Sequence, residues 1–266
     1  MNPLYDQYIS GELNCDITTM DQLSKDDILT YPYKYKTLLL VYYGYIVEDF
    51  DYDIEEIDNF GRSGYLIATI KGNLPMMKFL EERGFDINKV LNNGGNALHL
   101  ASFYSHLEIV KYLIEEKNFD INSQTNDRQN AYVYSYGNAN YEIMNYLEEQ
   151  GINIYDVPID LFLDSIEHHD LQMMRYLFDK GFTTHNLSFH PSQNAYLHAM
   201  AYTTAAEVGD TKKMEYLEEI GFDVHSKNIN KENAYQIAIR NENQDVIDYL
   251  TNKGLNNEPT SLCIIS

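Results

Sequence analysis

Histidine and cysteine are the side chains of this 266-residue sequence best suited to chemistry, and their spacing builds no reactive site. Cys15 and Cys263 have neither a Cys nor a His at the spacing of a metal ligand. His168 and His169 are adjacent, so on a helix they point apart and make a poor metal pair. Four more histidines also lack ligand spacing: His185, His190, His198 and His225. We therefore expect no metal site, no cofactor and no enzymatic activity.

The paired glutamates and the glycines give no catalytic arrangement either. Four Glu-Glu pairs fall in the last turn of predicted helices, where we expect them to be solvated: Glu81–Glu82, Glu115–Glu116, Glu148–Glu149 and Glu218–Glu219. Apart from the adjacent Gly94 and Gly95, the glycines stand singly, so we expect no phosphate-binding loop. An unrecognised active site around His168 or in residues 201–208 is the alternative that stays open.

The net charge of −22, from 41 acidic and 19 basic side chains, narrows the choice of partner. Such a charge repels phosphate backbones, which argues against nucleic acid and favours a basic protein surface. The alternative is that the charge only keeps the protein soluble. Two cysteines are too few for a disulfide framework, so we expect a reducing, cytoplasmic location. The first residues, MNPLYDQYIS, show no signal peptide, and the longest apolar stretch, Thr37–Val47, is too short to span a membrane.

Signals for the start and end of helices recur at a nearly constant interval. Ser, Asn and Asp favour the N-cap of a helix, and Gly or Asn favours the left-handed residue that closes one. The six predicted pairs are Ser63 and Gly84, Asn96 and Asn118, Asn130 and Gly151, Asp160 and Gly181, Asn194 and Gly221, and Asn233 and Gly254. Four pairs are 21 residues apart (for example, 84 − 63 = 21), and the second is 22 apart (118 − 96 = 22). The fifth is 27 apart (221 − 194 = 27), which predicts about six extra residues near 201–208.

Between each start and end, apolar residues follow two short helical stripes. In the second unit Ala97, Leu98 and Ala101 form the first stripe, and Ile109 and Leu113 belong to the second. Helices this short cannot bury their apolar faces alone, so neighbouring units must stack. The pattern predicts a repeated turn, inner helix, bend and outer helix.

The stretch NNGGNALHLASFYSHLEIVKYLIEEKNFDIN, residues 92–122, resembles an ankyrin repeat. NALHLA stands where that family has T-P-L-H-x-A, and HLEIVKYLIE matches its second helix. The resemblance covers Asp58 to Leu255 and is weaker in the fourth and fifth units, where DLFLDS keeps little of the pattern. It implies an all-α ankyrin-repeat solenoid of about six helix-turn-helix repeats with short hairpin turns. The expected repeats, numbered one to six, are 58–90, 91–124, 125–155, 156–186, 187–227 and 228–255.

The two ends of the chain depart from this pattern. We expect residues 1–57 to form a helical N-terminal cap or a degenerate repeat, because the terminal apolar face of a stack must be covered. An F-box-like hook beginning at Met20–Leu29 is the alternative for this segment. Residues 256–266 are predicted to form a flexible tail that ends in CIIS.

The resemblance also implies where a partner would bind, since ankyrin stacks usually hold partners in the concave groove of hairpin tips and inner helices. The aligned groove positions are Ile67, Ile70, Lys71, Leu100, Phe103, Tyr104, Tyr134, Gly137, Asn138, Asp164, Glu167, His168, Ile237, Arg240 and Asn241. We predict that Phe103, Tyr104 and Tyr134 form an exposed aromatic anchor and that Asp164 and Glu167 add negative charge. The predicted contact set is completed by Asn138, His168 and Arg240. The partner would then be a protein segment with an apolar anchor or a basic flank; the alternative is that the three rings are ordinary core.

Two further positions follow from the family pattern. His99 stands where the family's histidine bonds the backbone between repeats, so we expect it to be structural. The family usually has Ala where Phe85, Phe119, Phe182 and Phe222 stand, and Ile152 fills the fifth of these positions. We expect these side chains to pack beneath the hairpins as an enlarged core between repeats.

The last four residues, CIIS, match the prenylation pattern of a Cys, two aliphatic residues and a terminal Ser, which favours a farnesyl group on Cys263. No polybasic stretch and no second Cys precede it, so a single lipid would give reversible membrane binding. A chance apolar end is the alternative. We therefore predict a monomeric, non-enzymatic interaction scaffold that resembles effectors delivered by intracellular microbes into the host cytoplasm. An adaptor for a ubiquitin ligase, with residues 1–57 as its hook, is the second hypothesis.

Overall fold

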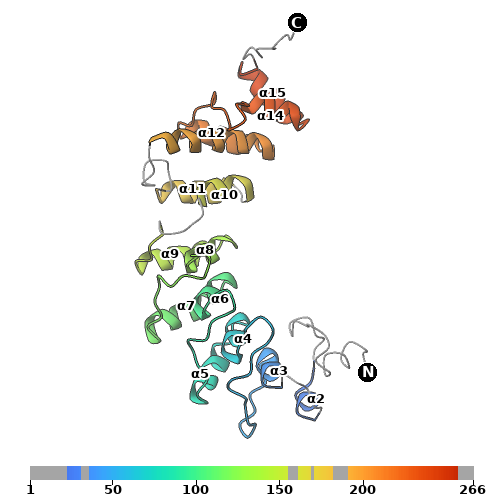
Figure 1. Ribbon diagram of the computed structural model, residues 1–266, viewed down its shortest axis with the longest axis vertical. Helices are drawn as coiled ribbons and strands as arrows, with labels where there is room; N and C mark the ends of the chain where they lie inside the picture. Colours follow the sequence, from blue (N-terminus) through green and yellow to red (C-terminus); the bar gives the residue numbers. More distant parts are fainter. Residues whose placement is uncertain (1–22, 31–35, 155–160, 169–170, 182–190, 257–266) are drawn as a thin grey trace. The chain divides into compact units, whose positions relative to one another are not determined.

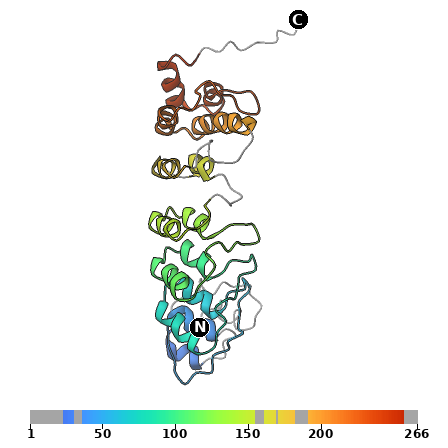
Figure 2. The ribbon, with the colours of Figure 1, turned by 90° about the vertical axis from the view of Figure 1, so that its left-hand side faces the viewer.

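The computed structural model describes residues 23–30, 36–154, 161–168, 171–181 and 191–256. All elements of secondary structure assigned within these ranges are helices. The chain divides into two compact units, residues 1–158 and 159–266. In each unit the described helices lie in antiparallel pairs, and in the first unit the loops that join one pair to the next, residues 83–96 and 117–130, project to the same side (Figures 1 and 2). This confirms the predicted all-α repeat architecture.

In the first unit, the described residues form two short helices before the first of three repeats. Its elements are α2 (Lys25–Thr30), α3 (Lys36–Tyr43), α4 (Gly64–Ile70), α5 (Leu74–Glu82), α6 (Ala97–Phe103), α7 (Leu107–Lys111), the π-helical turn η2 (Tyr112–Glu116), α8 (Ala131–Tyr136) and α9 (Tyr141–Glu149). The inner helices stack in chain order, α3 on α4, α4 on α6 and α6 on α8, while α5, α7 and α9 pack outside them. Burial of methionine and leucine side chains between the layers holds the stack together.

The second unit repeats this arrangement. Its elements are α10 (Leu161–His168), α11 (Leu171–Asp179), α12 (Pro191–Val208), α13 (Thr211–Glu219), α14 (Ala234–Arg240) and α15 (Gln244–Asn252). The inner helices α10, α12 and α14 stack in order, and each contacts its own outer helix.

The predicted helix ends are confirmed wherever the structure describes them, with one exception. The side chains of Ser63, Asn96, Asn130 and Asn233 each accept a hydrogen bond from a backbone N–H in the first turn of the following inner helix. The predicted closing residues all have a positive φ: Gly84, Asn118, Gly151, Gly181, Gly221 and Gly254. Asp160 lies outside the described residues.

The second repeat is one residue longer than its neighbours because its outer helix contains a π-helical turn. Helix α7 passes into η2, and the extra residue is taken up before Asn118 closes the helix at φ 54°. The 22-residue separation from Asn96 is therefore a bulge within the helix, and it leaves the inner helix and the hairpin in register.

The predicted start of the fifth repeat at Asn194 is wrong. Asn194 lies inside α12, which begins at Pro191, so it caps no helix. The outer helix α13 is capped by Asp210, ten residues after Met200, as α5 is capped by Asn73 ten residues after Ser63. Met200 is then the true equivalent of Ser63, and the separation to the closing Gly221 is again 21 (221 − 200 = 21). The extra residues extend α12 at its N-terminal end, and residues 201–208 contain no insertion.

The enlarged core beneath the hairpins is confirmed at three of the five positions. Phe85, Ile152 and Phe222 are 4, 6 and 6% exposed. A Cβ on Gly64 would lie 2.9 Å from the Phe85 ring, so this ring packs against the start of the inner helix α4. Phe119 is half-buried, and Phe182 lies outside the described residues. Phe85, Ile152 and Phe222 are therefore part of the core and do not form a second binding surface on the outer loops.

The described residues 36–57 contain an incomplete repeat at the N-terminal side of the stack. Helix α3 takes the place of an inner helix on α4, and Gly44 ends it with φ 75°, as Gly72 does for α4 with φ 67°. No outer helix follows in residues 44–57. Instead Tyr52 packs its ring edge-to-face against Phe79 of α5, with 5.5 Å between the ring centroids. The first complete repeat is thus covered on its N-terminal side.

Candidate binding surface

His99 is structural, as expected. Its ring is buried, with Nε2 3.1 Å from the Ser123 carbonyl oxygen and 3.2 Å from that of Gln129, while Nδ1 accepts from the Asn96 N–H. Burial lowers the pKa of His99 to about 4, and the two carbonyls only partly oppose this. The neutral imidazole thus joins the second repeat to the third, and it is not available for proton transfer at the surface.

The aromatic patch, Phe103, Tyr104 and Tyr134, forms on the inner helices of repeats two and three. Phe103 is 40% and Tyr104 42% exposed, and Tyr134 is half-buried. The Phe103 ring centroid lies 5.1 Å from that of Tyr104 and 6.2 Å from that of Tyr134, both edge-to-face. Tyr134 is further held by its ring contact with His99 and by a hydrogen bond from Asn93. The rings are therefore pre-ordered on a surface and are not ordinary core.

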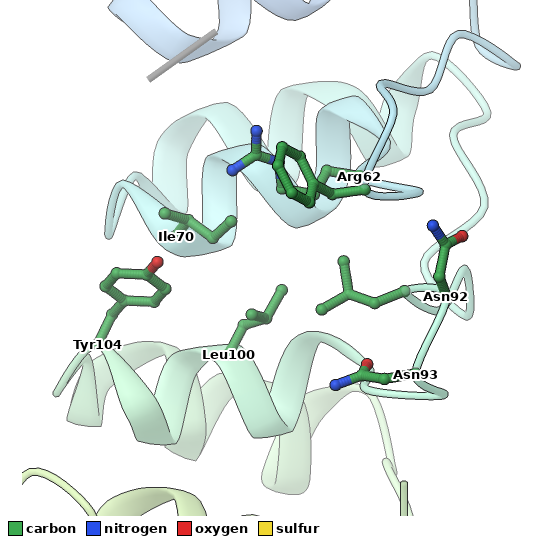
Figure 3. A pocket seen from close by; sticks show the side chains of 8 residues that line it. Arg62, Ile70, Asn92, Asn93, Leu100 and Tyr104 are labelled. Atoms are coloured by element: carbon green, nitrogen blue, oxygen red, sulfur yellow. The ribbon is translucent and has the colours of Figure 1, made fainter. Parts of the chain in front are cut away.

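A pocket opens beside the aromatic patch, between repeats one and two. Figure 3 shows Ile70 of α4 facing Leu100 and Tyr104 across it, with Asn92 and Asn93 at the hairpin end. Phe60, Arg62 and Leu91 complete the lining, and the cavity measures about 330 Å³. That volume lies at the lower end of the ~300–1,000 Å³ typical of ligand pockets, so it suits one or two side chains of a partner segment.

The hairpin end of this pocket is rigid. The amide of Asn92 donates to the Asn59 carbonyl 3.3 Å away, and the amide of Asn126 donates to the Asn92 carbonyl at the same distance. Arg62 is 7% exposed, pairs with Asp58 at 2.5 Å and lies over the Phe60 ring, with 4.8 Å to the centroid. A partner would therefore meet a preformed pocket wall.

Not every aligned groove position faces the solvent. Ile67 and Ile237 are 2 and 1% exposed, and Leu100 is 7% exposed, so these three belong to the core or the pocket floor. The prediction that they face the groove is wrong, because these aliphatic side chains are buried between repeats. Asn138 is exposed, and its side-chain amide donates to the Phe103 carbonyl, which ties repeat three to repeat two beside the aromatic patch.

The predicted acidic residues lie in the second unit, on α10. The Asp164 side chain is 24% exposed, and those of Glu167 and His168 are both 60% exposed. His168 Nδ1 lies 3.2 Å from Asp164 Oδ1, and its Nε2 lies 3.9 Å from Glu167 Oε1. In the corrected register of repeat five, the residue equivalent to Glu167 is the exposed Glu207, so two successive inner helices present a carboxylate at the same position.

Arg240 is less available than the alignment implied. Its guanidinium pairs with Glu232 at 2.6 Å and with Glu207 at 3.3 Å. It therefore neutralises carboxylates of its own unit, and it is also the one predicted contact residue whose charge would repel a basic partner.

The expectation that the Glu-Glu pairs are solvated is wrong for Glu81 and Glu218. Glu81 accepts hydrogen bonds from Tyr65, in its own repeat, at 2.8 Å and from Tyr112, in the next repeat, at 2.8 and 2.9 Å, and it pairs with Lys117. Glu218 accepts from Tyr202 and Tyr249, both at 2.7 Å, and pairs with Lys253. We call these two groups the carboxylate clusters.

The carboxylate clusters follow a spacing pattern that is visible in the sequence. A Tyr two residues after the helix start and another sixteen residues after the next start both point at the first Glu of the pair. Burial, and then the neighbouring carboxylate, raises the pKa of Tyr65 and of Tyr202, so both hydroxyls stay protonated donors.

A lysine stands in the core of repeat five. Lys213 is 3% exposed, at the position where repeats one and six have the buried Met76 and Val246. Its ammonium donates to the Ile166 carbonyl at 2.7 Å and lies 3.8 Å from Asp210 Oδ2. The hydrogen bond from this ammonium to Ile166 links α13 to the end of α10.

Among the described residues, no group of three or more His, Cys, Asp or Glu side chains is placed to hold a metal ion. None of the described helices is long and apolar enough to cross a membrane. Cys15 and Cys263 lie outside the described residues, so the prediction for the tail stays a prediction.

Comparison with known proteins identifies the repeat unit. The model of ankyrin repeats (three copies) matches residues 37–125 and 65–157. The Notch-regulated ankyrin repeat-containing protein of Homo sapiens is 39% identical over 61 residues, which are 22% of this chain and 54% of that protein.

The matches to enzymes are short. The eye-specific diacylglycerol kinase of Drosophila melanogaster is 45% identical over 49 residues, 18% of this chain and 3% of the kinase. The L-asparaginase of Dirofilaria immitis is 45% identical over 47 residues, 18% of this chain and 8% of that enzyme. This chain thus spans about half of the length of the Notch-regulated protein and only 3 and 8% of the length of the two enzymes.

A solved structure shares the fold. One chain of the complex between a predatory endopeptidase from Bdellovibrio bacteriovorus and an immunity protein aligns with a TM-score of 0.54 and 21% identity. The alignment covers 71% of the present chain and 97% of that chain.

Proposed function

Since this chain belongs to the ankyrin-repeat family, whose repeats mark protein-interaction scaffolds, we propose that it is a non-enzymatic scaffold that binds a partner segment through the aromatic patch. The observation that carries the proposal is the exposure of Phe103 and Tyr104, 40 and 42%, next to the pocket between α4 and α6. Exposed aromatic side chains beside a preformed pocket are typical of the anchors that dominate binding energy.

The charge of the protein supports a basic partner. The net charge is −22, and carboxylates recur on the inner helices as Asp164, Glu167 and Glu207. We infer a segment in which an apolar or aromatic side chain enters the pocket and Lys or Arg residues flank it. The scaffold acts as a monomer in this proposal.

Selection of binders from a random peptide library tests this proposal. We expect the selected peptides to contain an apolar anchor near Lys or Arg, and the Phe103→Ala/Tyr104→Ala variant to bind them roughly 100-fold more weakly, since anchors contribute about 2 kcal/mol or more each. Val208→Ala is the matched control, because Val208 is equally exposed at 45% on an inner helix of the other unit. Peptides that bind the double variant as tightly as the parent would contradict the proposal.

We further propose that Cys263 carries a farnesyl group that tethers the scaffold reversibly to membranes, as in a microbial effector acting in a eukaryotic host. What supports this is the tail sequence CIIS. Expression in eukaryotic cells of the parent and of Cys263→Ser checks it: we expect the parent in the membrane fraction and the variant in the cytoplasm. An identical cytoplasmic distribution of both would refute the anchor.

A substrate adaptor of a ubiquitin ligase is the alternative function. Helix α2, Lys25–Thr30, with Ser24 accepting from the Asp27 N–H at its start, supplies a short helical element ahead of the cap. In this case deletion of residues 1–22 or the change Ile28→Asp would remove ligase subunits that co-purify with the parent. If no such subunits co-purify with the parent, the adaptor hypothesis is wrong.

A further inference from the structure

The last repeat carries an apolar face that no described part of the chain covers. Ile239, near the end of α14, is 52% exposed. Tyr235 of the same helix and Ile247 of α15 are half-buried. These three side chains form what we call the terminal face.

The other repeats show that the terminal face is the surface that normally packs against the next repeat. The residues equivalent to Ile239 are Thr69, Ser102, Ile166 and Ala206, and each of them is fully buried. The residues equivalent to Tyr235 and Ile247, such as Tyr65 and Met77 in repeat one, are also fully buried. The helices α4, α6, α10 and α12 each have a following inner helix stacked on them, whereas none of the described helices follows α14 and α15.

The composition of the terminal face is the reverse of what an exposed end requires. Terminal repeats of a stack normally present polar residues outward, because the last face meets water. Here the terminal repeat has Ile239, which is 52% exposed, and the same residue type at this position of repeat four, Ile166, is fully buried. On the N-terminal side of the first complete repeat, α3 packs on α4, whereas none of the described helices packs on the terminal face in this way.

We propose that the C-terminal segment, residues 257–266, covers the terminal face, with Leu262, Ile264 and Ile265 packing on Tyr235, Ile239 and Ile247. The segment has the required composition, since three of its last five residues are large and aliphatic. Burial of aliphatic side chains against an exposed apolar face is favourable in water and needs no partner from outside the chain.

The segment is also long enough. Helix α15 has nine residues and is therefore about 14 Å long. Leu262 lies six residues after Asn256, and six residues in extended form reach about 20 Å, which is more than the length of α15. The aliphatic residues can thus lie against any part of the terminal face.

Charge disfavours a second copy of the chain as the occupant. Glu242, Asp245 and Asp248 are exposed on the turn and the helix that border the terminal face. Two copies meeting through this face would bring two such sets of carboxylates together, in a protein whose net charge is already −22.

Disulfide trapping in the full-length, unlipidated protein tests the proposal. With Cys15→Ser in place, Cys263 is the remaining native thiol, and Ile239→Cys or Ile247→Cys offers it a partner on the terminal face. Both positions are partly exposed, so the substitutions open no core cavity. Val208→Cys, 45% exposed on α12, is the matched control. We expect a disulfide within one chain from position 239 or 247 on mild oxidation, at least tenfold faster than from position 208.

Hydrogen exchange gives the second readout. The variant Leu262→Asp/Ile264→Asp/Ile265→Asp should raise the exchange rates of α14 and α15 amides several-fold, and Glu258→Gln should leave them unchanged. The proposal requires both results. Disulfides that form only between chains would assign the terminal face to a second copy and overturn it. Equal trapping at position 208, no trapping at either face position, or unchanged exchange would overturn it as well.

Discussion

The two units of this protein, residues 1–158 and 159–266, share a packing frame and differ in the surface they present. The carboxylate cluster of Glu81 in the first unit recurs around Glu218 in the second, with tyrosine hydroxyls from two successive repeats at 2.7 to 2.9 Å in both. A lysine from the later repeat completes each cluster. The recurrence indicates that residues joining one repeat to the next are constrained by packing in both units.

Three inner-helix positions, by contrast, are aromatic in repeats two and three of the first unit and polar or charged in repeat four of the second. Phe103, Tyr104 and Tyr134 stand at the positions that Glu167, His168 and Asp164 occupy in repeat four. Neither set is needed to close the core, because Phe103, Tyr104, Glu167 and His168 are all exposed. Side chains at these positions can therefore vary without disturbing the packing of the repeats. Four predictions test whether packing and binding depend on separate sets of residues.

The largest expected effect concerns His99 and the pH dependence of stability in the first unit. The pKa of His99 is about 4 in the folded protein and 6.5 when exposed, so between these values the unfolded chain binds more protons. The contribution of His99 to the free energy of unfolding is fully present above pH 6.5. It falls by about 3 kcal/mol as the pH falls towards 4. Chemical denaturation of the parent and of His99→Gln across this range measures the difference, which should shrink as the pH falls.

The control must account for a carboxyl group with the opposite behaviour. Burial raises the pKa of Glu56 to about 7, although the Leu38 N–H opposes the shift, so stability from this group falls as the pH rises from 4.5 through 7. The stability of the parent as a function of pH therefore contains two opposite contributions, one from His99 and one from Glu56. Only the difference in stability between the parent and His99→Gln reports on His99. His225→Gln, an exposed histidine, should leave that difference at zero. A His99→Gln difference that does not change with pH would contradict the structural role.

The carboxylate clusters predict equal effects in the two units. Glu81→Ala or Glu218→Ala leaves two tyrosine hydroxyls without their acceptor and one lysine without its ion pair, so each should cost about 2 kcal/mol. The pKa of Glu218 is lowered because, although burial alone would raise it, its bonds from Lys253, Tyr249 and Tyr202 outweigh burial. Urea denaturation measures the cost. The exposed neighbours give controls, and Glu82→Ala and Glu219→Ala should each cost below about 0.5 kcal/mol. If one cluster proved neutral, the frame would not be shared.

The smallest expected effect is at Lys213, where the second unit departs from the frame. Lys213→Met restores the residue type found at the same position as Met76 and removes a buried ammonium whose main partner is a carbonyl oxygen. We expect the free energy of unfolding to rise by up to about 1 kcal/mol. Thermal denaturation checks the change, with Lys212→Met as the exposed control. A loss of more than 1 kcal/mol would show that the bond to Ile166 stabilises the junction between α10 and α13.

The sequence predicted the frame well because helix ends depend on local chemistry. Ser63, Asn96, Asn130 and Asn233 cap their helices through side-chain bonds to residues two or three positions away. The failure at Asn194 has the same origin, because an N-cap signal can also occur inside a helix. The start of the repeat at Met200 follows from the cap of α13 at Asp210 and the closing residue Gly221.

The surface could be predicted only in part. The resemblance to ankyrin repeats places Phe103 and Tyr104 at groove positions, but their exposed fractions of 40 and 42% come only from the structure. The two carboxylate clusters join residues 16 and 31 positions apart, so treating each Glu-Glu pair as the end of a single helix hid them. Lys213 reaches a carbonyl 47 residues away, which no local pattern reveals.

The central claim is that the aromatic patch of the first unit provides the affinity for a partner and that the carboxylates of the second add only long-range attraction. Fluorescence-anisotropy titration of a selected, labelled peptide at about 50 and 500 mM salt tests it most directly, because salt screens charge but not apolar contact. We predict that Phe103→Ala/Tyr104→Ala lowers affinity strongly at both salt concentrations, whereas Asp164→Asn/Glu167→Gln lowers it only a few-fold and only at low salt. A double aromatic variant that binds like the parent while the carboxylate variant loses binding at both salt concentrations would contradict the claim.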